Sequence, residues 1–229
     1  MQAPRGKLYK ILSQLMNYLK VFTIVLITSL LLPVTASNNQ YRVLKQLESE
    51  LLQELNLLRS NPQKYAQILR KYRGSYRGNY LHFSQEKTLK LQEGVRILDE
   101  VIYKLSQQQS LHRLKLSAGM SLAAKDHALD LLQTGQIKHS GSDRSNPFDR
   151  MSRYGKWKII AGETINVGRE TAREIIVKFL IDDGEPSRNR RANLLKKNYT
   201  TCGISCVNNS NSSNTTCVMT YSGGYVEKN

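Results

Sequence analysis

The chain has 229 residues, of which 40% are hydrophobic and 23% are charged. This composition excludes a disordered tail and a collagen-like fibre, and the length allows one large domain or two small ones. Lys and Arg number 34 against 18 Asp and Glu, so the formal charge is +16 and the surface should meet anions. Three cysteines are too few for a disulfide-built scaffold, so an apolar core must hold the fold.

Residues 21–34 form an apolar run of 14 residues without a charged side chain, whereas a helix needs about 20 residues to cross a bilayer. Basic residues precede the run, and the small residues Val34 and Ala36 follow it. This pattern is typical of a secretory signal peptide cleaved after about Ala36. We therefore expect residues 1–36 to be removed on export, and a start at Met16 would give a more compact signal. The alternative is an uncleaved signal anchor.

Loss of that segment would remove four basic and no acidic residues, so the formal charge would fall from +16 to +12. Export would also argue against nucleic acid as a partner, because the compartment is wrong. The far end of the chain fits export too, since it contains four N-glycosylation acceptor sequences. They begin at Asn198, Asn208, Asn211 and Asn214.

Leucines at helical spacing predict an amphipathic helix over residues 44–58. The helix should pause before Asn61 and Pro62, because Asn is a good N-cap and Pro suits the first position of a new helix. This second helix should end near Gly74. Residues 73–88 are polar, aromatic and glycine-bearing, so we expect a loop there.

Apolar residues at helical spacing predict a third helix over residues 91–105 and a fourth over residues 120–131 that Gly135 closes. His127 lies on or beside the apolar stripe of the fourth helix. We interpret it as a histidine at the edge of the core, with a functional role as the alternative. A fifth helix begins at a capping box of Thr171 and Glu174.

Strands follow the helices. Apolar and polar side chains alternate over residues 202–206 and again over residues 217–221. The polar stretch between the two segments predicts a hairpin with a long loop. A shorter strand is expected over residues 164–167. No internal repeat and no convincing linker divides residues 41–225, which favours one domain.

The hairpin carries all three cysteines. Cys206 leaves the first strand and Cys217 enters the second, so the two should face each other across the ladder. Cys202 lies four residues before Cys206 on the same face, about 13 Å away along an extended strand. We predict a disulfide between Cys206 and Cys217 and a buried free thiol at Cys202.

Three glycine-bearing loops contain residue types that could carry chemistry: residues 139–143, 162–166 and 182–191. Histidine and glutamate would suit a metal or general acid–base work. The spacings of 24 and 27 residues between His139, Glu163 and Arg190 fit no compact metal motif. Turns rich in Ser, Asp and Gly also need no function, so a purely structural interpretation stays open.

The order of these segments resembles the CAP superfamily, the cysteine-rich secretory, antigen-five and pathogenesis-related class-one proteins. Four segments carry the resemblance: HSGSD, GETI, LIDDGEPSRNRRANLL and GISC. Within the superfamily, the sequence most resembles the shorter SCP domains of bacteria and protists. It covers residues 48–225, with a lead-in over residues 37–47 and a tail over residues 226–229. The resemblance implies an α+β fold, a three-layer α-β-α sandwich with a central cleft, here with extra N-terminal helices.

Many members of this superfamily gather two His and two acidic residues in the cleft and sometimes bind zinc. The resemblance places His139 and Glu163 at two of these positions, and Asp182 or Asp183 near the third. Arg190 replaces the second histidine. The cleft implied by the resemblance is lined by His139, Ser142, Asp143, Glu163, Asp182, Asp183, Arg188 and Arg190.

Arg190 changes the chemistry of that site. A guanidinium stays protonated and has no lone pair to give a metal. It would more naturally pair with Glu163 or an aspartate. We therefore expect neither zinc nor another cofactor.

The sequence favours a secreted, monomeric binding or interaction module that takes lipid, sterol or an anionic surface ligand. Basic residues and tyrosines interleave over residues 70–80, which fits anionic lipid or glycan, or simply a solvated helix end. The alternative is a hydrolase that uses His139 and Glu163. A third interpretation is a degenerate paralogue with only a surface role.

Overall fold

The computed structural model describes residues 38–208 and 214–228, together with Met16. By its contacts the chain divides into residues 1–44 and residues 45–229. In the first unit, the described residues 38–44 are helical. Apart from Met16, the predicted signal peptide lies outside the described residues, as does the acceptor Asn211. Across the described ranges, no helix has the length and apolar character that crossing a membrane requires.

The N-terminal helices of the second unit follow the sequence pattern. Residues 45–60 are helical, and α2 (Pro62–Gly74) begins where the cap predicted it. The side chain of Asn61 accepts a hydrogen bond from the backbone N–H of Lys64 at 3.0 Å. The third helix, α3 (Val95–Gln107), begins later than expected, because Gly94 precedes it at φ +67° and interrupts the helical backbone.

The loop predicted over residues 73–88 is wrong in part. The segment forms a three-stranded antiparallel sheet of β1 (Tyr76–Arg77), β2 (Tyr80–His82) and β3 (Thr88–Lys90). Gly78 and Asn79 connect the first two strands, and both have positive φ, at 50° and 70°. A two-residue turn with two positive φ values is the favoured hairpin connection.

A four-stranded sheet forms the centre of the second unit, in the order β4-β7-β8-β6. It contains β4 (Lys115–Leu116), β6 (Ala161–Gly168), β7 (Thr201–Asn208) and β8 (Thr215–Ser222). The β7–β8 pair is the predicted hairpin, and β6 extends the expected short strand at both ends. Only the short β4 runs parallel to its neighbour, among the strands of this sheet.

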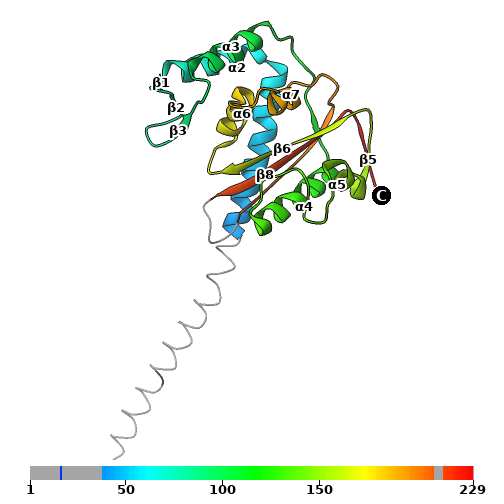
Figure 1. Ribbon diagram of the computed structural model, residues 1–229. Helices are drawn as coiled ribbons and strands as arrows, with labels where there is room; N and C mark the ends of the chain where they lie inside the picture. The colour runs from blue at the N-terminus through cyan, green and yellow to red at the C-terminus, as the bar shows by residue number, and fades with distance from the viewer. Residues whose placement is uncertain (1–15, 17–37, 209–213, 229) are drawn as a thin grey trace, which may run out of the picture. The chain divides into compact units, whose positions relative to one another are not determined.

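Helices cover both faces of this sheet (Figure 1). On one face lies α4 (Ala118–Thr134), which packs so closely that a Cβ at Gly203 would sit 2.2 Å from the backbone of Met120. On the other face lie α6 (Ala172–Ile181), α7 (Asn189–Leu194) and residues 45–60. The three-layer α-β-α sandwich and the α+β class are therefore confirmed.

The buried guanidinium of Arg59 connects the 45–60 helix to the end of α7 and the residues that follow it. It donates to the backbone carbonyls of Leu194, Lys196 and Tyr199 at 2.9, 3.1 and 3.1 Å. The ring of Tyr199 in turn stacks on Tyr221 of β8, with centroids 5.4 Å apart. These contacts connect residues far apart in the sequence to the centre of the sheet.

Neither α7 nor β4 was predicted. Three more short elements were also not predicted: α5 (Pro147–Tyr154), β5 (Gly155–Trp157) and β9 (Tyr225–Glu227). The two strands pair with each other as a separate antiparallel ribbon. The helix begins with Asn146 as its N-cap, Pro147 at its first position and Asp149 completing a capping box. Those signals are visible in the sequence.

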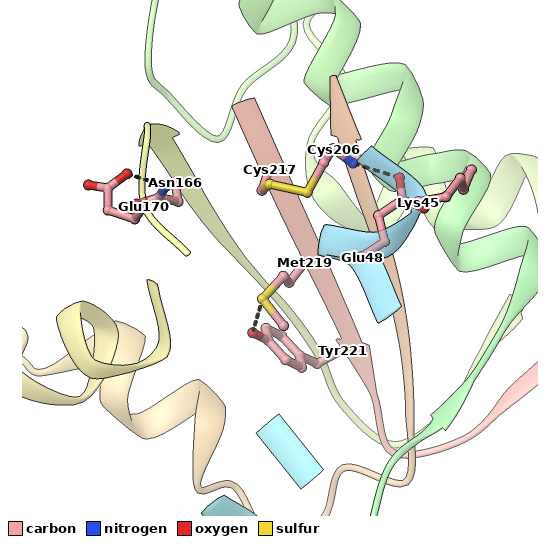
Figure 2. Close-up of a disulfide and its surroundings, with 8 residues drawn as sticks. All are labelled: Lys45, Glu48, Asn166, Glu170, Cys206, Cys217, Met219 and Tyr221. Atoms are coloured by element: carbon pink, nitrogen blue, oxygen red, sulfur yellow. Dashed lines mark hydrogen bonds and ion pairs between the residues drawn. A yellow bond between two sulfur atoms is a disulfide. The ribbon is translucent and has the colours of Figure 1, made fainter. Parts of the chain in front are cut away.

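The predicted disulfide is confirmed (Figure 2). Cys206 and Cys217 are directly opposed partners of β7 and β8, with Cα atoms 4.1 Å apart, and their sulfur atoms are bonded. Cys202 is buried and free, also as predicted. The backbone N–H of Cys206 donates to the carboxylate of Glu48 at 2.9 Å, so a side chain of the 45–60 helix covers the outer edge of β7 there.

Candidate functional site

The candidate site is centred on Glu163, the third residue of β6. Glu163 pairs in register with Thr220 of β8, which itself pairs with Gly203 of β7. The hydroxyl of Thr220 donates to the carbonyl of Met120 in α4, which places this row of the sheet on the α4 face. The Glu163 side chain is only 1% exposed. A carboxylate so deeply buried needs partners.

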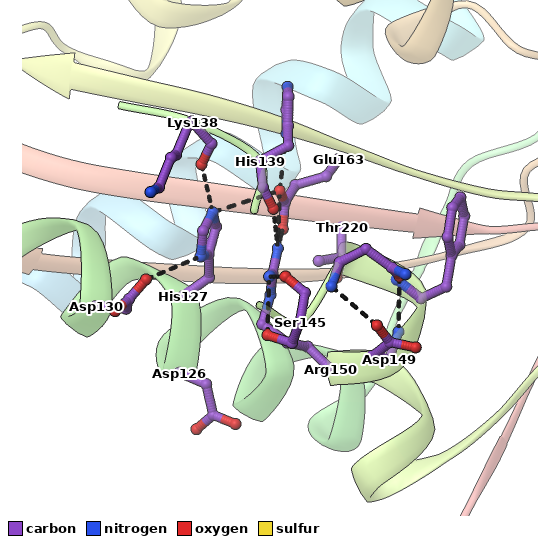
Figure 3. Close-up of polar contacts among 12 residues, drawn as sticks. Asp126, His127, Asp130, Lys138, His139, Ser145, Asp149, Arg150, Glu163 and Thr220 are labelled. Carbon is purple, nitrogen blue, oxygen red and sulfur yellow. Dashed lines mark hydrogen bonds and ion pairs between the residues drawn. The ribbon is translucent and has the colours of Figure 1, made fainter. Parts of the chain in front are cut away.

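Arg150 of α5 is the main partner (Figure 3). Its Nη2 lies 2.9 Å from Oε2 and 3.1 Å from Oε1 of Glu163, and its side chain is 2% exposed. The same guanidinium donates to the carbonyls of Ser145 at 2.9 Å and His139 at 3.0 Å. Arg150 therefore fixes both the carboxylate and the loop that carries His139.

His139 is brought to Glu163 as the resemblance implied. Its Nδ1 lies 2.8 Å from Oε1 of Glu163, and its side chain is 60% exposed. The pair offers an imidazole to solvent with a carboxylate behind it, which is a geometry that general-base chemistry uses. A nucleophile would have to come from outside the pair, such as a water molecule.

His127 of α4 is the second histidine beside Glu163. Its Nε2 lies 2.8 Å from the carbonyl of Lys138 and 3.7 Å from Oε1 of Glu163. A carbonyl oxygen only accepts, so Nε2 carries the hydrogen and Nδ1 carries the lone pair. Burial lowers the pKa of His127, which keeps the ring neutral. This histidine lies fully inside the protein rather than at the edge of the core.

Ser142 and Asp143 lie in the loop that follows His139. The backbone N–H of Ser142 donates to Asp130 of α4 at 3.0 Å. Asp143 accepts from the backbone N–H of Ser145 and pairs with Arg153, and these contacts hold the pKa of its carboxyl well below the usual range. Both residues thus join the loop to α4 and α5.

Asp182 and Arg190 form a second cluster. Asp182 is fully buried and accepts the Nε–H of Arg190 and the backbone N–H groups of Arg190 and Arg191. The prediction that Arg190 pairs with an acidic residue is confirmed, with Asp182 as the partner rather than Glu163. Asp182 thereby caps the first turn of α7.

Asp183 and Arg188 point to the segment before α3 instead of to Glu163. Asp183 accepts from the backbone N–H groups of Gln92 and Glu93 at 2.6 and 3.0 Å. Arg188 forms a double contact with the Glu93 carboxylate and lowers its pKa to about 2. These two residues anchor the loop between α6 and α7.

The structure thus divides the eight predicted cleft residues into two groups. His139, Ser142, Asp143 and Glu163 gather near α4 and α5, whereas Asp182, Asp183, Arg188 and Arg190 hold the start of α7. Asn193 of α7 connects the groups, since its side chain donates to the backbone carbonyl of Glu163 at 3.2 Å. Sequence reasoning missed Arg150, although the Asn146 cap could have revealed its helix.

The donor set does not fit the zinc tetrad of the superfamily. The Glu163 carboxylate is occupied by a guanidinium, and Arg190 has no lone pair. Among the residues that the structure describes, no three His, Cys, Asp or Glu side chains are grouped so as to hold a metal ion. We therefore derive no chemistry through a metal at this site.

Comparison with known proteins identifies the relatives of this fold. The family model for the cysteine-rich secretory protein family (CAP) matches residues 38–221. Among curated proteins, the uncharacterized protein YkwD of Bacillus subtilis is 28% identical over 101 residues. That match covers 44% of this chain and 37% of the relative, so the chain spans well under half of that protein's length.

Solved structures show similarity at low sequence identity. An outer surface protein of Borrelia burgdorferi is 18% identical with a TM-score of 0.43, over 49% of this chain and 78% of the other. An extracellular SCP-domain protein of Bacillus anthracis is 16% identical with a TM-score of 0.40, over 56% of this chain and 37% of the other. The CAP domain of enterococcal PrgA is 17% identical with a TM-score of 0.37, over 69% of this chain and 70% of the other.

Proposed function

The chain belongs to the cysteine-rich secretory protein (CAP) family, and we propose that it is an exported binding module that docks on an anionic lipid surface. The proposal rests first on the state of the candidate site. Glu163, the residue best suited to acid–base work, is held in a buried ion pair with Arg150. A carboxylate fixed in this way contributes to structure rather than to turnover.

The surface near β5 supports a lipid partner. Ile159 follows this strand with 77% of its surface exposed, although its φ of 66° is strained for a β-branched side chain. Lys156 and Lys158 precede it in the chain and are exposed. Phe148 is exposed nearby against Trp157, with ring centroids 5.3 Å apart. Apolar and basic side chains together are what binds an anionic membrane interface.

Sedimentation with vesicles tests this proposal. We expect binding to phosphatidylcholine vesicles that contain phosphatidylglycerol, and weaker binding without the anionic lipid or at high salt. Ile159→Asn removes the apolar side chain while Asn tolerates the left-handed backbone, so binding should fall about tenfold. Ile137→Asn is the matched control, because Ile137 is 66% exposed in a different loop. Equal binding by both variants would contradict the proposed surface.

Export is tested separately. We propose that residues 1–36 are removed, and N-terminal sequencing of protein from the culture medium should begin near residue 37. A secreted form that starts at Met1 or Met16 would contradict this. Asn198 and Asn214 are exposed and Asn208 is half-buried, so glycosylation at these positions remains a prediction for a eukaryotic host.

The exposed His139 imidazole, which contacts the buried Glu163 carboxylate, favours a hydrolase as the second candidate. Turnover of a panel of simple esters decides between the two. Activity that His139→Ala abolishes, with the fold intact by circular dichroism, would favour the hydrolase. No turnover above that of the variant would support the binding module.

A further inference from the structure

One face of the small sheet of β1, β2 and β3 carries a row of two cations with a tyrosine between them. Arg77 pairs in register with Tyr80, and Tyr80 pairs with Lys90. Directly opposed residues of antiparallel strands point to the same face of a sheet, so the three side chains lie side by side. All three are exposed, and Tyr80 is 41% exposed.

The other face of this sheet is packed and holds the row in place. Leu81 is fully buried there, and its partners on the neighbouring strands, Tyr76 and Leu89, are half-buried. The turn between β1 and β2 is anchored as well, since the carbonyl of Asn79 accepts a hydrogen bond from the backbone N–H of Leu91 at 2.8 Å. The row therefore stands on a fixed platform rather than on a free loop.

The protein itself does not neutralise these two cations. Across residues 38–208 and 214–228, no carboxylate forms an ion pair with Arg77 or Lys90. Nη1 of Arg77 donates to the carbonyls of Gly74 and Tyr76 at 2.9 and 2.7 Å, which fixes the guanidinium. Its Nε and Nη2 groups have no partner in the described part of the chain, and together they form the fork that binds an anion through two hydrogen bonds. The acidic residue nearest in the chain, Glu86, lies in the turn between β2 and β3.

Charge and shape together select the partner. The cations stand on the two outer strands, about 10 Å apart, and the ring between them offers a flat apolar face. Among residues 70–96, Tyr80 is the one large apolar side chain that is exposed, so this face has no aliphatic group to insert into a membrane. We propose that it binds an acidic polysaccharide. A sugar ring stacks on Tyr80, and carboxylate or sulfate groups of the saccharide contact Arg77 and Lys90. The proposal does not depend on the lipid surface, because β5 belongs to a different sheet.

Calorimetry with the full chain tests the proposal, with a galacturonate oligomer and a dextran sulfate oligomer of equal length as probes. We expect saturable binding of at least one of them, and the comparison of the two assigns the anion as carboxylate or sulfate. The methyl-esterified galacturonate oligomer has the rings without the charge, and oligoglutamate has the charge without the rings. Both should bind about fivefold more weakly or less, because each lacks one half of the contact.

Variants locate the binding on this face. Arg77→Gln combined with Lys90→Gln should lower the affinity for the acidic saccharide about tenfold, as expected for the loss of two exposed ion pairs. Arg113→Gln combined with Lys125→Gln is the matched control, since it removes one exposed Arg and one exposed Lys elsewhere. This control should bind like the unchanged chain. Tyr80→Leu should cost about fivefold with the saccharide and leave oligoglutamate unaffected, because only the flat ring is lost.

Four results would overturn the proposal. The first is no saturable binding of either acidic saccharide. The second is equal binding of oligoglutamate, which would reduce the effect to charge alone. The third is tighter binding of oligothymidylate than of either saccharide, which would make the face a nucleic-acid surface. The fourth is equal affinity of the double variant and its matched control. Because the panel of ligands uses the unaltered chain, it decides the matter even if a variant fails to fold.

Discussion

Arg150→Met is expected to destabilise the protein strongly. The side chains of Arg150 and Glu163 are 2% and 1% exposed, so the substitution leaves a buried carboxylate without its main counter-charge. Removing one partner of a buried ion pair costs about 3–5 kcal/mol. For a domain of this size that corresponds to a fall of roughly 6–20 °C in Tm. The carbonyls of Ser145 and His139 also lose a donor.

Urea unfolding followed by tryptophan fluorescence measures this cost. Trp157 is the only tryptophan and packs against the core cluster of Met120, Ala123 and Met151, so its emission reports the integrity of this region. Arg153→Met is the control, because Arg153 lies on the same helix but is 40% exposed. Exposed pairs contribute little, and this variant should lose less than about 1 kcal/mol.

A double variant checks the cause. Glu163→Gln alone should also be strongly destabilising, since it leaves the guanidinium buried and unpaired. Combined with Arg150→Met, the total loss should be smaller than the sum of the two by about 1–3 kcal/mol. A cost below about 1 kcal/mol for Arg150→Met, or strict additivity, would refute the view that this ion pair fixes the site.

Three further outcomes are expected. Arg190→His should raise zinc affinity in calorimetry above that of the unchanged chain, since imidazole restores a lone pair; no gain in a folded variant would contradict this. Replacing Cys206 and Cys217 by serine should cost about 2–3 kcal/mol in urea unfolding, because the bond closes a loop of sequence separation 11; an unchanged midpoint would argue against it. Burial lowers the pKa of His127, so below about pH 6.5 the unfolded chain binds more protons than the folded chain. The free energy of unfolding should therefore fall as the pH drops through that range, and His127→Gln should flatten this pH dependence.

Local signals predicted much of the fold. The caps of α2 and α6 lie where Asn61 and Thr171 indicated, because an N-cap is decided within one turn of the helix. The disulfide followed from the position of two cysteines at the base of one loop. The β1–β2 hairpin was missed because its strands are only two and three residues long and carry little alternation.

The candidate site was predictable only in part. The resemblance brought His139 and Glu163 together correctly, and the chemistry of guanidinium gave Arg190 an acidic partner. That chemistry could not decide whether Glu163 or Asp182 is the partner of Arg190, since the choice depends on how α7 packs against the sheet. Arg150 and Glu163 are 13 positions apart in the chain, with the strand β5 between them, so no periodic pattern links the two.

Two arginines form ion pairs with acidic residues of the candidate site. Arg150 occupies the central carboxylate from α5, and Arg190 pairs with Asp182 at the start of α7. Both act on groups that acid–base or metal chemistry would need free.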